Sequence, residues 1–107
     1  MSGNGADRLR IDLAARSPAE ATLSLVGELD LVTVPLLRDE LARHSARGVR
    51  VVLDLSEVRF VDSTGLVLLM ESARAVDARI ALRRDISPSV ARLLQVTKTE
   101  GLFAWVD

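Results

Sequence analysis

The clearest candidate for chemistry is a short polar turn, Asp62-Ser63-Thr64-Gly65, which stands between an apolar strand segment and an apolar helix segment. The first N–H groups of a helix have no intrahelical partner, and the peptide dipoles direct their positive end toward them. A negative group is therefore stabilised at the start of the helix. This position makes Ser63 a candidate for carrying a phosphate.

The same turn also has a purely structural explanation. Asp and Ser are both favoured as N-caps, where a side-chain oxygen accepts a backbone N–H and contributes about 1 kcal/mol to stability. The turn by itself therefore predicts that Asp62 or Ser63 caps a helix. A further role for Ser63 depends on the rest of the chain.

Two strands and a turn are predicted before the first helix. Apolar and polar residues alternate over residues 8–14 and again over residues 21–26, as in half-buried strands. Residues 17–20 have the composition of a turn, so we expect a hairpin. Residues 1–7 contain no apolar stretch and are expected to form a disordered tail rather than a signal peptide.

Two helices are predicted around the central strand. The first carries Val34, Leu37 and Leu41 at helical spacing, with Thr33 as its N-cap and Gly48 at its end. The second follows the polar turn and has one apolar face. Its inward residues are expected to be Leu66, Leu69, Met70, Ala73 and Val76.

The period of the second helix also identifies an outward residue. Val67 is expected on the outer side, one turn from Ser63. An exposed valine is ordinary by itself. Beside a modifiable serine, however, it is a reasonable contact for a partner.

A parallel sheet is expected between the helices. Residues 51–53 are apolar on both faces, which is typical of a central strand, and residues 80–82 and 103–106 supply two more strands. A last helix opens at Ser87, which is followed by proline. The alternation of strands and helices predicts right-handed crossovers.

The predicted fold class is α/β: a single domain over residues 8–107, with a mixed, mostly parallel sheet, an N-terminal hairpin and about three to four helices.

The composition and net charge of the chain exclude several classes of function. The chain has 107 residues with 49% apolar content, enough for one compact core. It contains no cysteine, which excludes disulfides, thiolate metal ligands and thiol catalysis. A formal net charge of -1 gives no reason to expect binding to nucleic acid or to an anionic membrane. The longest apolar run, residues 66–70, is far shorter than the roughly 20 residues of a membrane span, so we expect a cytoplasmic protein.

Two carboxylates are expected to lie near each other. Sites in open α/β sheets form at the carboxyl ends of the strands, and in the predicted topology Asp30 and Asp62 both follow such ends. An acid/base pair, a metal site, a contact with a partner protein, and simple solvation or capping all fit this arrangement. Glu28 competes with Asp30 for each of these roles.

An enzymatic role for Ser63 is not favoured. The residues around it differ from the glycine-flanked nucleophile elbow of hydrolases, and the one candidate base, His44, lies in a charged run typical of a solvated helix face. A single histidine without cysteine makes a transition-metal site unexpected. The chain has no glycine-rich phosphate loop. We therefore expect no enzyme activity, no cofactor and no bound metal, and we expect Ser63 to be modified by another protein.

Several motifs, in their order along the chain, resemble the STAS family and, within it, the small bacterial anti-sigma factor antagonists. Residues 27–30, Gly-Glu-Leu-Asp, resemble the first signature of the family, and residues 51–56 followed by 61–66 resemble its central one. Residues 87–94 and the following residues 101–103 are similar to the last helix and the closing strand of the family. The resemblance covers nearly the whole chain.

Two positions depart from the family pattern. Lys98 stands where glycine is common, and Val67 stands where a small residue is common. The first departure concerns the exit from the last helix, and the second concerns the selection of a partner.

The resemblance implies a module that regulates transcription by partner switching in a stress response. Unphosphorylated at Ser63, it would bind an anti-sigma factor that is also a serine kinase and so release a sigma factor. The kinase would phosphorylate Ser63, and a serine phosphatase would remove the phosphate. The implied contact residues are Asp30, Asp62, Thr64, Gly65 and Val67. A second hypothesis from the same resemblance is a cytosolic STAS subunit of a membrane transporter assembly, in which Ser63 need not be modified.

Overall fold

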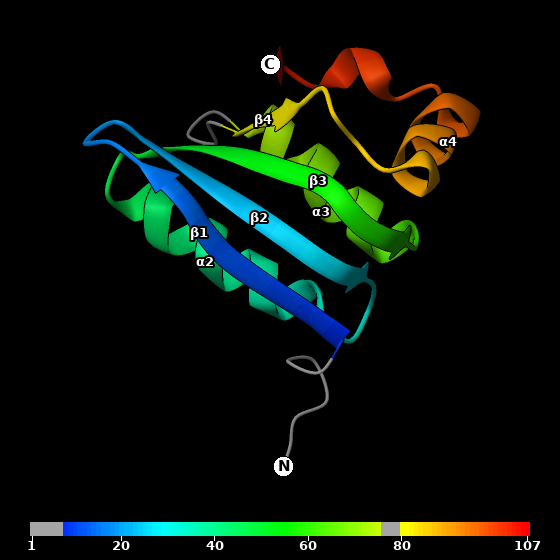
Figure 1. Cartoon of the computed structure of the whole chain (residues 1–107), viewed down its shortest axis with the longest axis horizontal. Helices are drawn as coiled ribbons and strands as arrows, with labels where there is room; N and C mark the ends of the chain where they lie inside the picture. Colours follow the sequence, from blue (N-terminus) through cyan, green and yellow to red (C-terminus); the bar gives the residue numbers. More distant parts are fainter. Residues whose placement is uncertain (1–7, 76–79) are drawn as a thin grey trace.

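Five strands form one mixed sheet in the computed structural model, which describes residues 8–75 and 80–107 (Figure 1). The strand order follows the chain, the first pair is antiparallel, and the other three pairs are parallel. The strands are β1 (Leu9–Arg16), β2 (Glu20–Leu29), β3 (Arg50–Val61), β4 (Ile80–Arg83) and β5 (Trp105–Val106). This confirms the predicted α/β fold class with its N-terminal hairpin.

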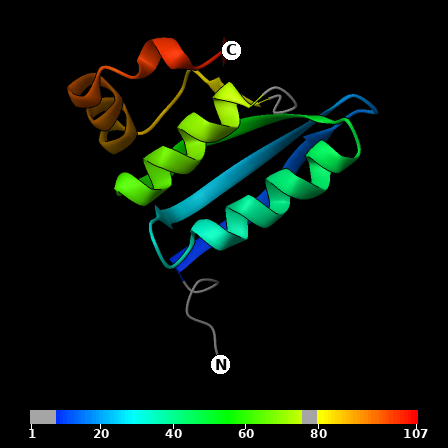
Figure 2. The same ribbon diagram turned by 180° about the vertical axis from the view of Figure 1, so that it is seen from behind.

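The helices lie on opposite faces of the sheet. α2 (Val34–Ala46) and α3 (Ser63–Arg74) lie side by side on one face (Figure 2), and α4 (Pro88–Thr97) packs against β3 from the other face. A short 3-10 helix, η1 (Glu100–Leu102), leads from α4 to β5. The helices of the described residues agree with the predicted number, and the outer face of the β1–β2 hairpin stays open.

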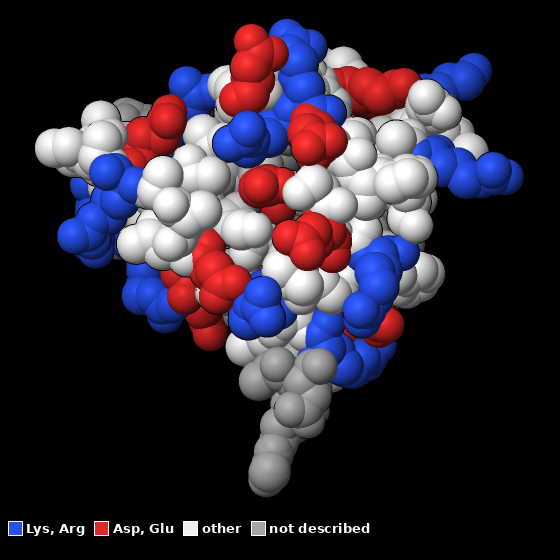
Figure 3. Space-filling view, in the orientation of Figure 1, with Lys and Arg blue, Asp and Glu red and all other residues white. Residues whose placement is uncertain are grey.

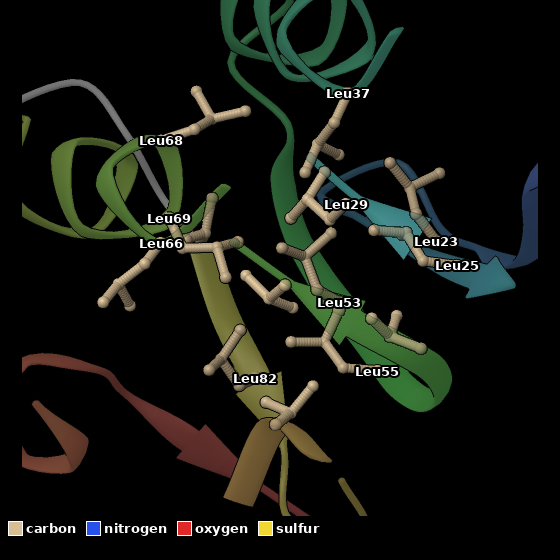
Figure 4. Packing of buried hydrophobic residues seen from close by; sticks show 14 of the residues in the cluster. Leu23, Leu25, Leu29, Leu37, Leu53, Leu55, Leu66, Leu68, Leu69 and Leu82 are labelled. Carbon is tan, nitrogen blue, oxygen red and sulfur yellow. The ribbon is translucent and has the colours of Figure 1, made fainter. Parts of the chain in front are cut away.

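The core lies between the sheet and the helices and consists mainly of leucine (Figure 4). β3 is buried on both faces at Val51, Val52 and Leu53, of which Val52 is the most exposed at 4%. This confirms the predicted central strand. Full burial of one such side chain contributes about 1.5–3 kcal/mol. The fully buried leucines are Leu23, Leu25, Leu29, Leu37, Leu53, Leu55, Leu69, Leu82 and Leu94.

Gly27 lets the two strands of the hairpin approach each other closely. Its φ of 123° is unfavourable for other residues, and a Cβ there would lie 2.1 Å from the carbonyl oxygen of Arg8. The glycine of the Gly-Glu-Leu-Asp motif therefore holds β1 against the segment that leads to Asp30.

The C-terminal part differs from the prediction in one boundary. The closing strand begins at Trp105 rather than at residue 103, because Phe103 turns into the core after η1. Lys98 ends α4 in the left-handed conformation, with a φ of 57°. Glycine adopts this conformation without strain, whereas other residues lose about 1–2 kcal/mol. The predictions for residues 1–7 and Val76 lie outside the described residues.

Candidate functional site at the start of helix α3

The side chain of Asp62 closes the turn before α3. Its Oδ1 accepts the backbone N–H of Gly65 at 2.9 Å, and its carbonyl oxygen accepts that of Leu66 at 3.0 Å. Of the two residues that the sequence allowed as N-cap, Asp62 therefore takes this role. Ser63 becomes the first residue of the helix.

Ser63 is exposed, and its hydroxyl is not used to hold the fold. Among the residues that the structure describes, none forms a hydrogen bond with this hydroxyl. It stands beside the first free N–H groups of α3, where the helix dipole stabilises an added negative charge. The position can therefore take a phosphate without a change in the core.

Asp62 also joins the turn to the loop between β2 and α2. Its Oδ2 accepts the backbone N–H of Leu31 at 3.1 Å, and its own backbone N–H donates to the carbonyl oxygen of Leu29 at 3.1 Å. The two segments that the topology predicted to be neighbours are thus in direct contact.

Gly65 allows the start of α3 to lie close to the end of β2. A Cβ at this position would lie 2.7 Å from the carbonyl oxygen of Leu29 and 2.9 Å from its Cγ. A larger residue would force the backbone to move in a closely packed region. Gly65 is buried, so it shapes the site and offers no side chain to a partner.

Asp30 shapes the neighbouring loop from a buried position, with 6% of its surface exposed. Its Oδ1 accepts the backbone N–H groups of Val32 and Thr33 at 3.0 and 3.1 Å, and its carbonyl oxygen accepts that of Val34 at 2.8 Å. A buried carboxylate needs such partners to offset its lost hydration. Asp30 therefore fixes the loop that carries Leu31 and Val32.

Thr33 is the N-cap residue of α2, as predicted, but its side chain forms no capping hydrogen bond. The Thr33 backbone is already helical, with φ and ψ of -93° and -19°. The hydroxyl instead accepts the N–H of Asp30 at 2.9 Å and donates to the carbonyl oxygen of Glu28 at 2.8 Å. These buried loop groups need partners, and that need outweighs the local preference of threonine for a cap.

Arg8 is a site residue that the sequence analysis missed. Its guanidinium donates to Glu28 at 2.9 Å and also pairs with the buried Asp30. The hydrogen bond to Glu28 raises the pKa of Arg8, and the negative charges of Asp30 and Asp62 raise it further. The sequence carries no local signal for these contacts, because the partners lie 20 and 22 residues away.

Exposed apolar side chains lie on the segments that meet at the Ser63 turn. Leu31 is 70% exposed, Val32 46% and Val67 49%. The outward position of Val67 and the burial of Leu69 confirm the predicted orientation of α3. Two consecutive apolar residues in a predicted loop were the signal for Leu31 and Val32, which the sequence analysis did not single out.

The carboxylates of Glu28, Asp30 and Asp62 outnumber the two guanidinium groups that contact them, those of Arg8 and, at 3.9 Å, Arg59. His44 is half-buried at the far end of α2, where its Nδ1 lies 2.8 Å from a backbone carbonyl oxygen of the same helix, so the fold does not bring it to Ser63. The described part of the chain contains no group of three or more His, Cys, Asp or Glu placed to hold a metal ion.

This arrangement, a five-stranded mixed sheet with an exposed serine at the start of the helix after its central strand, defines a STAS-type domain. The family model described as "Mlab, STAS domain" matches residues 13–104. The chain belongs to the STAS domain family. Within the described ranges, no helix is long and apolar enough to cross a membrane.

Curated relatives of the chain are named as anti-sigma factor antagonists. The chain is 30% identical over 89 residues to "Anti-sigma-F factor antagonist RsfB" of Mycobacterium tuberculosis, covering 78% of this chain and 73% of the relative. It is 25% identical over 92 residues to "Anti-sigma-B factor antagonist" of Listeria monocytogenes, covering 83% of this chain and 81% of the relative.

Solved structures with the same fold include an anti-sigma factor antagonist from Mycobacterium paratuberculosis, with a TM-score of 0.77 at 24% identity, covering 92% of this chain and 86% of that one. Unphosphorylated SpoIIAA matches with a TM-score of 0.72 at 22% identity, covering 92% and 89%. Bacillus SpoIIAA in its phosphorylated form matches with a TM-score of 0.66 at 21% identity, covering 92% of each chain. These matches confirm the predicted STAS-like fold.

Proposed function

We propose that this protein is an anti-sigma factor antagonist controlled by phosphorylation of Ser63. In its unphosphorylated form it binds an anti-sigma factor that is also a serine kinase, and this binding frees a sigma factor. The observation that carries the proposal is the exposed Ser63 hydroxyl at the start of α3, which forms no hydrogen bond with the described residues. The names of the relatives support the same class of partner.

The covalent step involves the kinase and its own ATP. The Ser63 oxygen forms a bond to the γ-phosphorus, loses its proton, and ADP leaves. A serine phosphatase restores the hydroxyl by hydrolysis and releases inorganic phosphate. Ser63 is the substrate in both steps, and this chain supplies no base for either.

The surface around Ser63 supports a role in protein binding. The exposed side chains of Leu31, Val32 and Val67 offer apolar area that a partner can cover. In this proposal Val67 and the half-buried Thr64 contact the kinase directly. The other implied residues, Asp30, Asp62 and Gly65, contribute mainly by keeping the turn and the loop in shape.

Phosphorylation is expected to change binding rather than folding. A phosphate adds about -1.5 to -2 charges at pH 7, and at a helix N-terminus that charge is locally favourable. Facing a partner, it adds to the carboxylates of Glu28 and Asp62, and like charges brought together in an interface cost several kcal/mol. The matches to SpoIIAA in both its unphosphorylated and its phosphorylated form support a fold that tolerates the modification.

Affinity for the cognate anti-sigma factor kinase tests the proposal. Ser63→Asp and Ser63→Glu are expected to bind at least about tenfold more weakly than wild type, while their melting temperatures stay close to the wild-type value. Gln95→Glu is the control, because it adds a negative charge at another exposed helical position, on α4. Equal affinities of the wild type and the two acidic variants at position 63 would contradict the switch.

The rival hypothesis of a transporter subunit makes a different prediction. In that case Ser63 carries no phosphate in the cell, and the protein co-purifies with a permease. Mass spectrometry of the protein isolated from its own host distinguishes the two hypotheses. Phosphorylated Ser63 together with a bound kinase supports the switch, and unmodified Ser63 together with a permease supports the rival.

A further inference from the structure

A groove between β3 and α4 has no part in the proposed switch. It has a volume of about 360 Å³ and is lined by residues 59–61 of β3 and by Ser89, Arg92, Leu93 and Val96 of α4. We refer to it as the α4 groove. Three features of its lining point to a ligand: a bulge in β3, an exposed apolar surface and positive charge, with Arg92 in no ion pair with a described residue and Arg59 in one long contact.

The bulge brings two side chains of β3 to the surface together. Gly27 pairs with Val58, and the next residue, Glu28, pairs with Phe60, so that Arg59 is an extra residue in β3. A bulge changes the direction of the neighbouring side chains and often lies beside a functional site. Arg59 and Phe60 are consecutive, yet both are exposed.

The apolar part of the α4 groove is open to solvent. Phe60 is 50% exposed and Val96 is 70% exposed, while Leu93 in the same groove is half-buried. A single exposed apolar residue is ordinary. Here, however, side chains from two separate elements line one groove, so they form a continuous surface that a partner can cover.

The α4 groove is also positively charged. Its described lining contains two arginines and no acidic residue. Arg92 forms no ion pair with any described residue, and Arg59 has one long contact, 3.9 Å from Glu28. In the space-filling view, acidic side chains lie over the middle of the open sheet face, and basic side chains project around its margins, including the side on which α4 lies (Figure 3). The positive charge is local, because the whole chain has a formal net charge of -1.

We propose that the α4 groove binds a short segment of a partner protein in which acidic residues flank an apolar side chain. The apolar side chain packs among Phe60, Leu93 and Val96. The carboxylates pair with Arg59 and Arg92, whose planar guanidinium groups match carboxylate geometry. The volume is that of a small ligand site, so it accommodates side chains of one segment rather than a domain.

This second surface goes beyond the proposed switch. α3 and α4 lie on opposite faces of the sheet (Figures 1 and 2). The groove lining ends at Val61, directly before the turn, and Arg59 contacts Glu28, but a segment that follows α4 on its own face of the sheet leaves the start of α3 accessible. Binding there is therefore expected to be the same whether or not Ser63 is phosphorylated. The protein can therefore bind one partner in the α4 groove while a second partner binds at Ser63.

Peptide selection tests the proposal. A phage-displayed library of random linear peptides is selected on the wild-type protein, and synthetic peptides are then measured by fluorescence anisotropy. Enriched peptides are expected to carry Asp or Glu beside Phe, Leu, Ile or Val. Such a peptide should bind Arg92→Glu and Val96→Asp at least about tenfold more weakly than wild type. Arg74→Glu is the control, because it changes an exposed arginine at the end of α3, and it should bind like wild type.

A charge-reversed peptide separates recognition from loss of fold. With Lys in place of its acidic residues, the peptide should bind Arg92→Glu more tightly than wild type. Ser63→Asp should bind the acidic peptide as tightly as wild type does. The proposal is overturned if acidic peptides are not enriched, if wild type, Arg92→Glu and Val96→Asp bind equally, or if Ser63→Asp loses binding. None of these results depends on the kinase measurement.

Discussion

Helices α3 and α4 begin in a similar way, but their serines are used differently. In α4 the buried Ser87 is itself the N-cap. Its hydroxyl accepts the N–H of Val90 at 3.2 Å and donates to the carbonyl oxygen of Val58 at 2.6 Å. In α3 the cap is Asp62, and Ser63 comes one position later.

This shift by one residue leaves the Ser63 hydroxyl exposed and without a hydrogen bond to any residue that the structure describes. Ser87 is 8% exposed, and its hydroxyl is engaged both as donor and as acceptor. Ser63 is exposed, and the carboxylate of Asp62 satisfies the helix end in its place. A phosphate on Ser63 therefore does not uncap α3, whereas the same group on Ser87 would break a buried hydrogen-bonded contact.

The largest effect is expected in phosphorylation itself. The cognate kinase with ATP should modify Ser63 and leave Ser87 unmodified, because a buried hydroxyl does not reach a kinase active site. Ser63→Ala should abolish incorporation, as measured by peptide mapping in a mass spectrometer. Phosphate found on Thr64, on Ser87 or in the Ser63→Ala protein would show that the first helical position of α3 is not what the kinase recognises.

The next largest effect separates the inner side of α3 from the surface that carries Ser63. Leu69→Ala should lower the free energy of unfolding by about 2–5 kcal/mol, because Leu69 is 1% exposed in the core. Val67→Asp should change it by no more than about 0.5 kcal/mol. Urea denaturation measures both values. Unfolding of Val67→Asp would mean that this side of α3 is packed and not free to contact a partner.

A third prediction concerns the residue that each cap binds, Gly65 in α3 and Val90 in α4. Gly65→Ala should destabilise the protein by about 1–3 kcal/mol, because its Cβ would press on the carbonyl group of Leu29. Gly101→Ala is the control, since a Cβ there would meet no atom within 4 Å. Equal stability of the two variants would indicate that α3 moves away from β2 without cost, which would weaken the view of a rigid site.

The smallest effect is the most direct test of the comparison. Ser87→Ala should cost about 1–2 kcal/mol, because it removes an N-cap and leaves the carbonyl oxygen of Val58 without its buried partner. Ser63→Ala should cost no more than about 0.5 kcal/mol. Unfolding free energies from urea titration give the two numbers, and similar losses would remove the distinction between the serines.

Much of the fold could be predicted from short-range pattern. Leu69 is buried and Val67 is exposed, as the helical period indicated, and Ser87 caps α4, as its position before a proline indicated. The sequence determines such features because they depend on residues within about one turn along the chain. The same reasoning limited the candidates for the N-cap residue of α3 to Asp62 and Ser63.

The contacts that shape the site were decided by the tertiary structure. Arg8 pairs with Asp30 across 22 residues, and the hydroxyl of Thr33, the N-cap residue of α2, binds the loop rather than the first N–H groups of the helix. Local pattern does not reveal such partners, because strand register decides which distant residues meet, and register depends on packing across the whole sheet. The bulge at Arg59 that helps to form the α4 groove has the same origin.

The choice of Asp62 over Ser63 as the cap shows how the two levels combine. The sequence by itself determined a polar turn at the start of a helix, because both residue types favour that position. The folded chain then placed the N–H of Leu31, from a loop 31 residues away, against the carboxylate of Asp62. A carboxylate has two oxygens that point in different directions, so Oδ1 accepts the N–H of Gly65 while Oδ2 accepts that of Leu31. Tertiary contact therefore assigned the cap to Asp62 and left Ser63 exposed.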